Sequence, residues 1–138
     1  MGFLIDTNVI SEVRKGSRCD PGVAAWYAAT DAADIYLSVL VLGEICKGVE
    51  RVRPRDPARA AALDRWLMQI VTGFGPRVLP VDAPVAARRG QSSAARSVPV
   101  IDALLAATAY VHGLTLVTRN EADMRDSGAI VFNPFTAR

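Results

Sequence analysis

The sequence predicts an α/β fold in which helices flank a mostly parallel, five-stranded sheet on both faces. Three observations support this class: five short apolar runs are typical of strands, helical segments separate them, and no internal repeat or linker-like stretch breaks the alternation. The chain has 138 residues, of which 51% are hydrophobic, so we expect a single domain over residues 1–138.

The predicted strands are short runs of apolar and β-branched residues bounded by polar or turn-forming residues. The run LTLVT is the clearest of them, and the others are FLI, IYLSV, RVLPVD and AIVF. In chain order the five ranges are 3–5, 35–39, 77–82, 114–118 and 129–132.

Helices are predicted where a capping residue precedes apolar residues at helical spacing. An aspartate closely followed by a proline marks three of these starts: Asp20 with Pro21, Asp56 with Pro57, and Asp82 with Pro84. The remaining helices are expected to begin near Thr7, after Ser38, at Ser97 and near Glu121. Gly113 is expected to end the strongly apolar helix that begins at Ser97.

Composition and charge narrow the class of protein without identifying a function. The net charge of +2 makes the chain mildly basic, which permits a nucleic-acid partner without requiring one. Cys19 and Cys46 form no CxxC pair and the N-terminus lacks a signal-peptide pattern, so we expect a cytoplasmic protein. No stretch approaches 18 apolar residues, so we expect no membrane association through a spanning segment. A mechanism based on histidine would depend on His112 alone.

Four acidic side chains are predicted to converge at one edge of the sheet. Asp6 ends the first strand and Asp123 follows the fourth, and sites in open α/β sheets form beyond the carboxyl ends of the strands. Asp102 and Glu44 lie on predicted helices that reach the same edge. The face of the helix that carries Asp102 is expected to be buried, because the residues at offsets of three and four are all apolar: Val98, Pro99, Leu105 and Ala106.

Three of these acids also have a simpler structural explanation. Asp6 could cap the helix that follows it, and Asp123 could be a first-turn acid favoured by the helix dipole. Glu44 could form a surface pair with Lys47. Asp102 resists such an explanation, because the predicted helix needs its cap near Ser97 rather than at position 102.

A divalent metal ion would explain the convergence of the four acids. Carboxylates gathered in one pocket repel one another unless a cation or a proton compensates them. Mg²⁺, or Mn²⁺ as a substitute, prefers oxygen ligands, activates a water molecule and neutralises charge on a phosphate. We therefore expect Asp6 and Asp102 to bind the metal, with Asp123 joining directly or through water. Glu44 is expected to orient the attacking water.

Four motifs, taken in chain order, resemble the PIN-domain nucleases. They are LIDTNVI, Ser38 with Glu44, VIDALLAATA and LVTRNEADM, and they span the whole chain. More closely, the chain resembles the VapC-type toxins of bacterial toxin–antitoxin pairs. The resemblance places the acidic quartet of the family at Asp6, Glu44, Asp102 and Asp123.

The resemblance also assigns supporting roles to polar residues. Thr118 and Asn120 match the residues that hold the acids in place, and Thr7 and Asn8 match the residues after the first aspartate. Met124 stands where the family has an aromatic residue, and an apolar packing role is compatible with that change.

For the protein as a whole, the resemblance implies a sheet with strand order 3-2-1-4-5 and a magnesium-dependent endoribonuclease. Such an enzyme hydrolyses RNA phosphodiester bonds with a water molecule that the metal activates. The resemblance further implies a homodimer and inhibition by a small cognate antitoxin protein.

Two other classes of function share parts of this pattern. DTNVI is close to the opening Asp-x-Asp motif of haloacid-dehalogenase-like phosphatases, but Asn8 replaces the second aspartate, and no lysine or paired acid follows Thr118. A receiver-like binding domain with an acidic pocket would require a lysine after the fourth or fifth strand, and the sequence has none there.

A basic stretch follows the helix that carries Glu44. Its cations are Lys47, Arg51, Arg53, Arg55 and Arg59. They could guide a phosphate backbone toward the acids or bind an acidic segment of an antitoxin, and a solvated surface is the simpler alternative. The two tryptophans, Trp26 and Trp66, are interpreted as core or dimer-interface residues because they recur with apolar residues at helical spacing.

Overall fold

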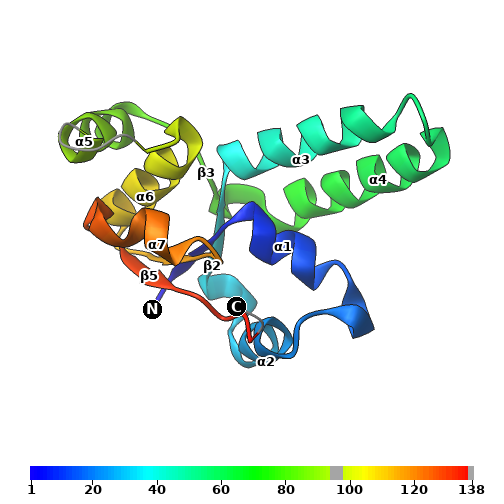
Figure 1. The fold of residues 1–138 in the computed structure, drawn as a ribbon, viewed down its shortest axis with the longest axis horizontal. Helices are drawn as coiled ribbons and strands as arrows, with labels where there is room; N and C mark the ends of the chain where they lie inside the picture. Colours follow the sequence, from blue (N-terminus) through cyan, green and yellow to red (C-terminus); the bar gives the residue numbers. More distant parts are fainter. Residues whose placement is uncertain (94–97, 137–138) are drawn as a thin grey trace.

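The computed structural model describes residues 1–93 and 98–136. Within them, a five-stranded sheet has the order β3-β2-β1-β4-β5, and every pair of neighbouring strands is parallel (Figure 1). The strands are β1 (Phe3–Ile5), β2 (Ile35–Ser38), β3 (Val78–Leu79), β4 (Thr115–Val117) and β5 (Ile130–Phe132). The predicted fold class and the strand order implied by the resemblance are confirmed.

The central strand β1 is covered on both faces. Leu4 and Ile5 are fully buried, and consecutive residues of a strand point to opposite faces of the sheet. Leu4 pairs with Tyr36 of β2 on one side and with Leu116 of β4 on the other. Two-sided burial is typical of parallel sheets. Asp6, the residue directly after β1, therefore lies at the edge of a closed apolar layer.

Helices occupy the segments between the strands. They are α1 (Thr7–Val13), α2 (Pro21–Ala29), α3 (Val39–Val52), α4 (Pro57–Phe74), α5 (Ala83–Ser93), α6 (Val100–His112) and α7 (Glu121–Met124). Helices α3 and α4 pack against each other on one side of the sheet, whereas α5 and α6 pack together on the other side (Figure 1). Among the described residues, no helix is long and apolar enough to cross a membrane.

The predicted aspartate caps are present at the starts of three helices. Asp20 accepts a hydrogen bond from the backbone N–H of Val23, and Asp56 accepts one from that of Arg59, each at 3.1 Å. Asp82 accepts one from the N–H of Val85 at 3.2 Å. Each aspartate therefore satisfies one of the N–H groups that the first turn leaves without a helical partner.

Strand β3 is shorter than predicted, since only two residues of the range 77–82 are extended and paired. Pro80 has no N–H to donate to a neighbouring strand, so the pairing stops at Leu79. Arg77 belongs to a short 3-10 turn at Gly75–Arg77 rather than to the strand.

Helix α6 begins at Val100 rather than at Ser97, which lies outside the described residues. Val98 precedes a proline and is therefore biased against helical backbone angles. Val98 and Pro99 both lie before the helix, so the prediction that they occupy helical offsets from Asp102 was wrong. Gly113 ends α6 with a positive φ of 66°, as predicted.

Candidate active site

Asp6 lies where β1 ends and α1 begins, and it is 5% exposed. Its Oδ1 accepts a hydrogen bond from the backbone N–H of Thr7 at 2.7 Å, so Asp6 does cap the helix that follows it. Its Oδ2 accepts a second bond, from the hydroxyl of Thr118 at 2.8 Å. Burial raises the pKa of Asp6, hydrogen bonds from Thr118 and Thr7 oppose this effect, and the Glu44 carboxylate adds to it. The capping role therefore accounts for one oxygen and leaves the convergence of charges unexplained.

Thr118 and Asn8 form a small network around Asp6. Thr118 is fully buried directly after β4, and its hydroxyl also accepts a hydrogen bond from the backbone N–H of Asn120 at 3.0 Å. The Asn8 amide donates to Asp6 Oδ2 and to Thr118 Oγ1, both at 3.4 Å, and accepts from the backbone N–H of Arg119 at 3.2 Å. Because these bonds join β1, α1 and β4, the sheet itself determines the position of Asp6.

Glu44 reaches the site from α3. Its Oε1 accepts a hydrogen bond from the Thr7 hydroxyl at 2.7 Å. Ser38 caps α3 by accepting a bond from the N–H of Leu40 at 3.0 Å, and it is fully buried at the end of β2. The alternative interpretation of Glu44 was a surface ion pair with Lys47. The described residues contain no such ion pair.

Asp102 and Asp123 belong to α6 and α7, which follow the first three strands in the chain. Asp102 is half-buried in the first turn of α6, and Asp123 is exposed in the first turn of α7. Burial raises the pKa of Asp102 most, and the charges of Asp6, Asp123 and Glu44 raise it further, in that order. The charges of the other three predicted acids therefore all reach Asp102. First-turn positions are favourable for acids, so the helix dipole offsets part of this repulsion.

The predicted supporting residues differ in what they contact. The Thr7 hydroxyl, the Asn8 amide and the Thr118 hydroxyl all bond to carboxylates of the site or to each other. Asn120 contributes its backbone N–H, and its side chain forms no hydrogen bond within the described part of the chain. Met124 is buried in the core, which agrees with its expected packing role.

The chemistry of the donor set fits a hard divalent cation. Four carboxylates supply the oxygen ligands that Mg²⁺ and Mn²⁺ prefer. Asp102 and Asp123 accept no hydrogen bond from the residues that the structure describes, so their oxygens remain available for a ligand. Within those residues, no three acidic, histidine or cysteine side chains are close enough to form a ready-made metal site.

The basic stretch divides into paired and unpaired side chains. Arg53 donates to Asp64 from two nitrogens at 3.0 Å each and to Glu50 at 2.7 Å, which ties α3 to α4. These carboxylates raise the pKa of Arg53 and neutralise its charge. The remaining cations of the stretch are exposed and form no ion pair within the described ranges: Lys47, Arg51, Arg55 and Arg59.

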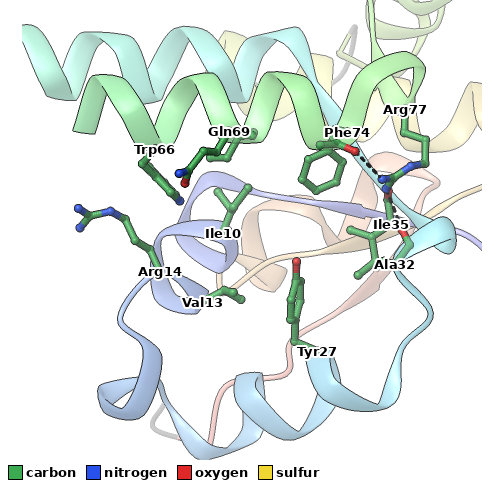
Figure 2. Close-up of a pocket in the computed structure, with 12 residues that line it drawn as sticks. Ile10, Val13, Arg14, Tyr27, Ala32, Ile35, Trp66, Gln69, Phe74 and Arg77 are labelled. Carbon is green, nitrogen blue, oxygen red and sulfur yellow. Dashed lines mark hydrogen bonds between the residues drawn. The ribbon is translucent and has the colours of Figure 1, made fainter. Parts of the chain in front are cut away.

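A cavity of about 320 Å³ lies between α1, α2 and α4 (Figure 2). Trp66 and Arg14 face each other at one end, with the guanidinium 5.2 Å from the ring centroid. At the other end, Arg77 donates hydrogen bonds to the carbonyl oxygens of Ala32 and Ile35. None of the four acids lines this cavity, so it is separate from the candidate active site.

A second open cavity does adjoin the acids, and we call it the α1–α3–α4 groove. It has a volume of about 290 Å³, and its lining includes Thr7 and Glu44. Ser11, Gly48 and Trp66 also line it, and the sequence pattern connects none of these three to the acids. The sequence offers no specific signal for these residues, since a glycine inside the same helix occurs at Gly43 as well as at Gly48.

Comparisons with known proteins agree with the fold and with the motifs. Residues 3–127 match the PIN domain family. Toxin FitB of Neisseria gonorrhoeae is 32% identical over 138 residues, covering 96% of this chain and 98% of FitB. VapC ribonuclease Y4jK of Sinorhizobium fredii is 31% identical over 138 residues, covering 96% of this chain and 97% of that protein. The crystal structure of FitAcB from Neisseria gonorrhoeae has a TM-score of 0.86 at 33% identity, covering 96% of this chain and 97% of that chain.

Proposed function

The chain belongs to the PIN-domain family, and on that premise we propose that it is a metal-dependent endoribonuclease that acts as the toxin of a toxin–antitoxin pair. The observation that carries the proposal is the electrostatic convergence of Asp102 with Asp6, Asp123 and Glu44 at one sheet edge. A relative named as a VapC ribonuclease and a relative named as a toxin support the activity and the biological role.

Asp6, Asp102 and Asp123 are the residues that would hold Mg²⁺, with Mn²⁺ as a substitute. A bound ion of this kind neutralises charge on the phosphate and makes a water molecule more acidic. Asp6 is the fixed ligand of the three, because the Thr118 hydroxyl and the Thr7 backbone N–H hold its two oxygens.

Glu44 is proposed to orient the water that attacks the phosphodiester bond. The Thr7 hydroxyl donates to Oε1 of Glu44, which directs the carboxylate toward Asp6 and leaves Oε2 to accept a hydrogen bond from water. The net reaction adds one water molecule across a phosphodiester bond of RNA. The exposed cations Lys47, Arg51 and Arg55 would bind the RNA backbone or an acidic segment of the partner.

The proposed protein partner is a small cognate antitoxin. The relative named Toxin FitB supports this assignment. We also propose a homodimer, for which exposed apolar side chains of α6 offer a surface: Val100, Ile101, Tyr110 and Val111. The cytoplasm is the compartment in which we propose that the pair acts.

The proposal is tested by incubating the purified protein with total cellular RNA in the presence of Mg²⁺ and in the presence of a chelator. We expect RNA cleavage that the chelator abolishes and that added Mg²⁺ or Mn²⁺ restores. Cleavage that survives exhaustive chelation would contradict the metal-dependent mechanism. Release of inorganic phosphate from small phosphoesters without RNA cleavage would instead support a phosphatase.

A further inference from the structure

The α1–α3–α4 groove is continuous with the candidate active site. Thr7 and Glu44, which share a hydrogen bond of 2.7 Å, line the groove and also belong to the acid cluster. Any group that occupies the groove therefore lies directly beside the carboxylate that is proposed to orient water. Under the proposed function, that group belongs to the RNA segment next to the bond being cleaved.

The groove has an apolar floor and one flat aromatic wall. Ile45 and Val49 of α3 and Leu63 of α4 line it together with Trp66. Trp66 also borders the larger cavity, where Arg14 lies over its ring at 5.2 Å (Figure 2). The indole thus separates the two cavities, and the Arg14 contact restricts its orientation. A flat, partly apolar nucleobase is the component of RNA that packs against such a surface.

Polar groups at the edges of the groove match the remainder of a nucleotide. Arg59 lines the groove from the first turns of α4, is exposed and has no ion pair among the described residues. An arginine in this position can bind a phosphate oxygen, and the Ser11 hydroxyl can bond to the edge of a base. The volume of about 290 Å³ is at the lower end for small-molecule sites, which suits a single nucleotide.

Gly48 lines the groove without contributing a side chain to it. A side chain added there would meet no atom within 4 Å, so the position is not a close contact between helices. Glycine inside a helix is less stable than alanine by roughly 0.5–1 kcal/mol. Glycine at this lining position therefore leaves open space beside the groove, as Gly43 leaves open space elsewhere on α3.

We infer that the α1–α3–α4 groove is a nucleotide subsite, in which Trp66 packs against the base next to the scissile phosphate and Arg59 binds the phosphate of that nucleotide. This assignment rests on the proposed ribonuclease function and adds to it a determinant of sequence preference. A protein segment is the competing occupant, but a single flat wall beside an unpaired arginine favours a nucleotide.

The first test fills the groove and leaves the rest of the molecule intact. Gly48→Leu places a side chain in the groove, whereas Gly73→Leu on α4 places one in the larger cavity, which Gly73 lines. Neither glycine has an atom within 4 Å of an added Cβ, so both variants should fold, and leucine should favour both helices. Mapping of RNA ends after digestion of total RNA gives the cleavage rate and the base preference at each flanking position.

We expect Gly48→Leu to raise KM at least ~10-fold and to flatten the base preference at one position beside the cleaved bond, whereas Gly73→Leu should match wild type. Arg59→Gln should weaken binding to all sequences alike and reduce its dependence on salt. Wild-type rate and wild-type end profiles from Gly48→Leu would overturn the inference. The same result with loss of antitoxin binding would assign the groove to the protein partner.

A second measurement does not depend on cleavage. Nucleoside monophosphates are titrated while tryptophan fluorescence is recorded, since stacking on Trp66 should change its emission. Wild type and Gly73→Leu should respond, and Gly48→Leu and Trp66→Phe should lose the response. A fluorescence response in wild type without RNA cleavage would contradict the proposed function but would still support the nucleotide subsite. Equal responses in wild type and Gly48→Leu would overturn the subsite whatever the activity.

Discussion

The candidate active site combines one firmly held acid with two acids that the protein holds loosely. Asp6 accepts hydrogen bonds from the Thr7 backbone and from the Thr118 hydroxyl, and it is 5% exposed. Asp102 and Asp123 lie in the first turns of two helices and accept no hydrogen bond within the described part of the chain. The difference indicates that hydrogen bonds fix the position of one proposed ligand, whereas the two proposed ligands on helices have no such hydrogen bonds among the described residues.

This arrangement separates two physical tasks. A buried carboxylate needs hydrogen bonds to offset the loss of hydration, and Asp6 accepts them from the backbone N–H of Thr7 at the start of α1 and from the hydroxyl of Thr118 just after β4. Asp102 and Asp123, if they bind a metal ion as proposed, have oxygens that no hydrogen bond from the described residues occupies. Both lie in the first turn of a helix, where the helix dipole stabilises negative charge.

The largest expected effect is on the rate of RNA cleavage, which tests whether Asp6 and Asp102 both take part in the reaction. Asp6→Asn and Asp102→Asn should each reduce the cleavage rate at least ~100-fold, because either change removes a proposed metal ligand. A buried acid remote from the site serves as the control: Glu12 accepts bonds from Lys15 and from the Asp20 backbone, and Glu12→Gln should leave cleavage by the folded protein unchanged. Near-wild-type cleavage by either aspartate variant would remove that residue from the mechanism.

Thr118→Val should lower the free energy of unfolding, because it removes a hydrogen bond to Asp6, the firmly held acid. The change keeps the shape of the side chain but deprives Asp6 of a donor and the Asn120 N–H of an acceptor in a buried place. We expect a loss of about 1–3 kcal/mol in the free energy of unfolding and a decrease of roughly 10-fold in cleavage.

Thr108→Val is the matched control for that experiment. Thr108 is also fully buried, but its hydroxyl donates only to the Leu104 carbonyl one turn earlier in α6. Its removal should change the unfolding free energy by less than about 1 kcal/mol and leave cleavage intact. Denaturant unfolding of the two variants measures the difference, and equal losses would show that the Thr118 network has no special role.

The firmly held region was also the part of the site that sequence reasoning located best. Asp6 directly follows a strand, and the end of that strand can be read from a run of apolar residues bounded by a polar one. The resemblance to the PIN-domain nucleases assigned Thr118. The strand order, which the resemblance implied, places β1 beside β4 and so brings the two residues together. The aspartate caps were predictable for a related reason, since a cap depends on residues only a few positions apart.

Asp102 and the surroundings of the site were harder to predict, because their geometry depends on where helices begin and on how the helices pack. Asp102 was placed in the interior of a helix from Ser97, whereas α6 begins at Val100 and Asp102 lies in its first turn. Arg53 was grouped with cations that could bind a partner, but Asp64 on the next helix neutralises it. The α1–α3–α4 groove arises from three helices at once, so no local pattern reveals it.

Magnesium should stabilise the protein through the loosely held acids. In the metal-free fold, the charges of Asp6, Asp123 and Glu44 repel Asp102, and a cation bound among them relieves this repulsion. If the dissociation constant is on the order of 1 mM, then roughly 10 mM Mg²⁺ adds about 1.4 kcal/mol to the free energy of unfolding. For a domain of this size, the melting temperature should rise by roughly 3–6 °C. Sodium chloride at matched ionic strength should have a much smaller effect.

Asp102→Asn sharpens this measurement, since it removes one of the mutually repelling charges at nearly constant shape. Without metal, the variant should melt no lower than wild type, because Asp102 forms no hydrogen bond within the described residues that the change would break. With Mg²⁺, it should lose most of the stabilisation, because a proposed ligand is gone. Thermal melts of both proteins with and without Mg²⁺ provide the comparison. An equal gain in both would mean that the stabilising ion binds elsewhere, and Asp102 would then have to be explained by the dipole of α6 alone.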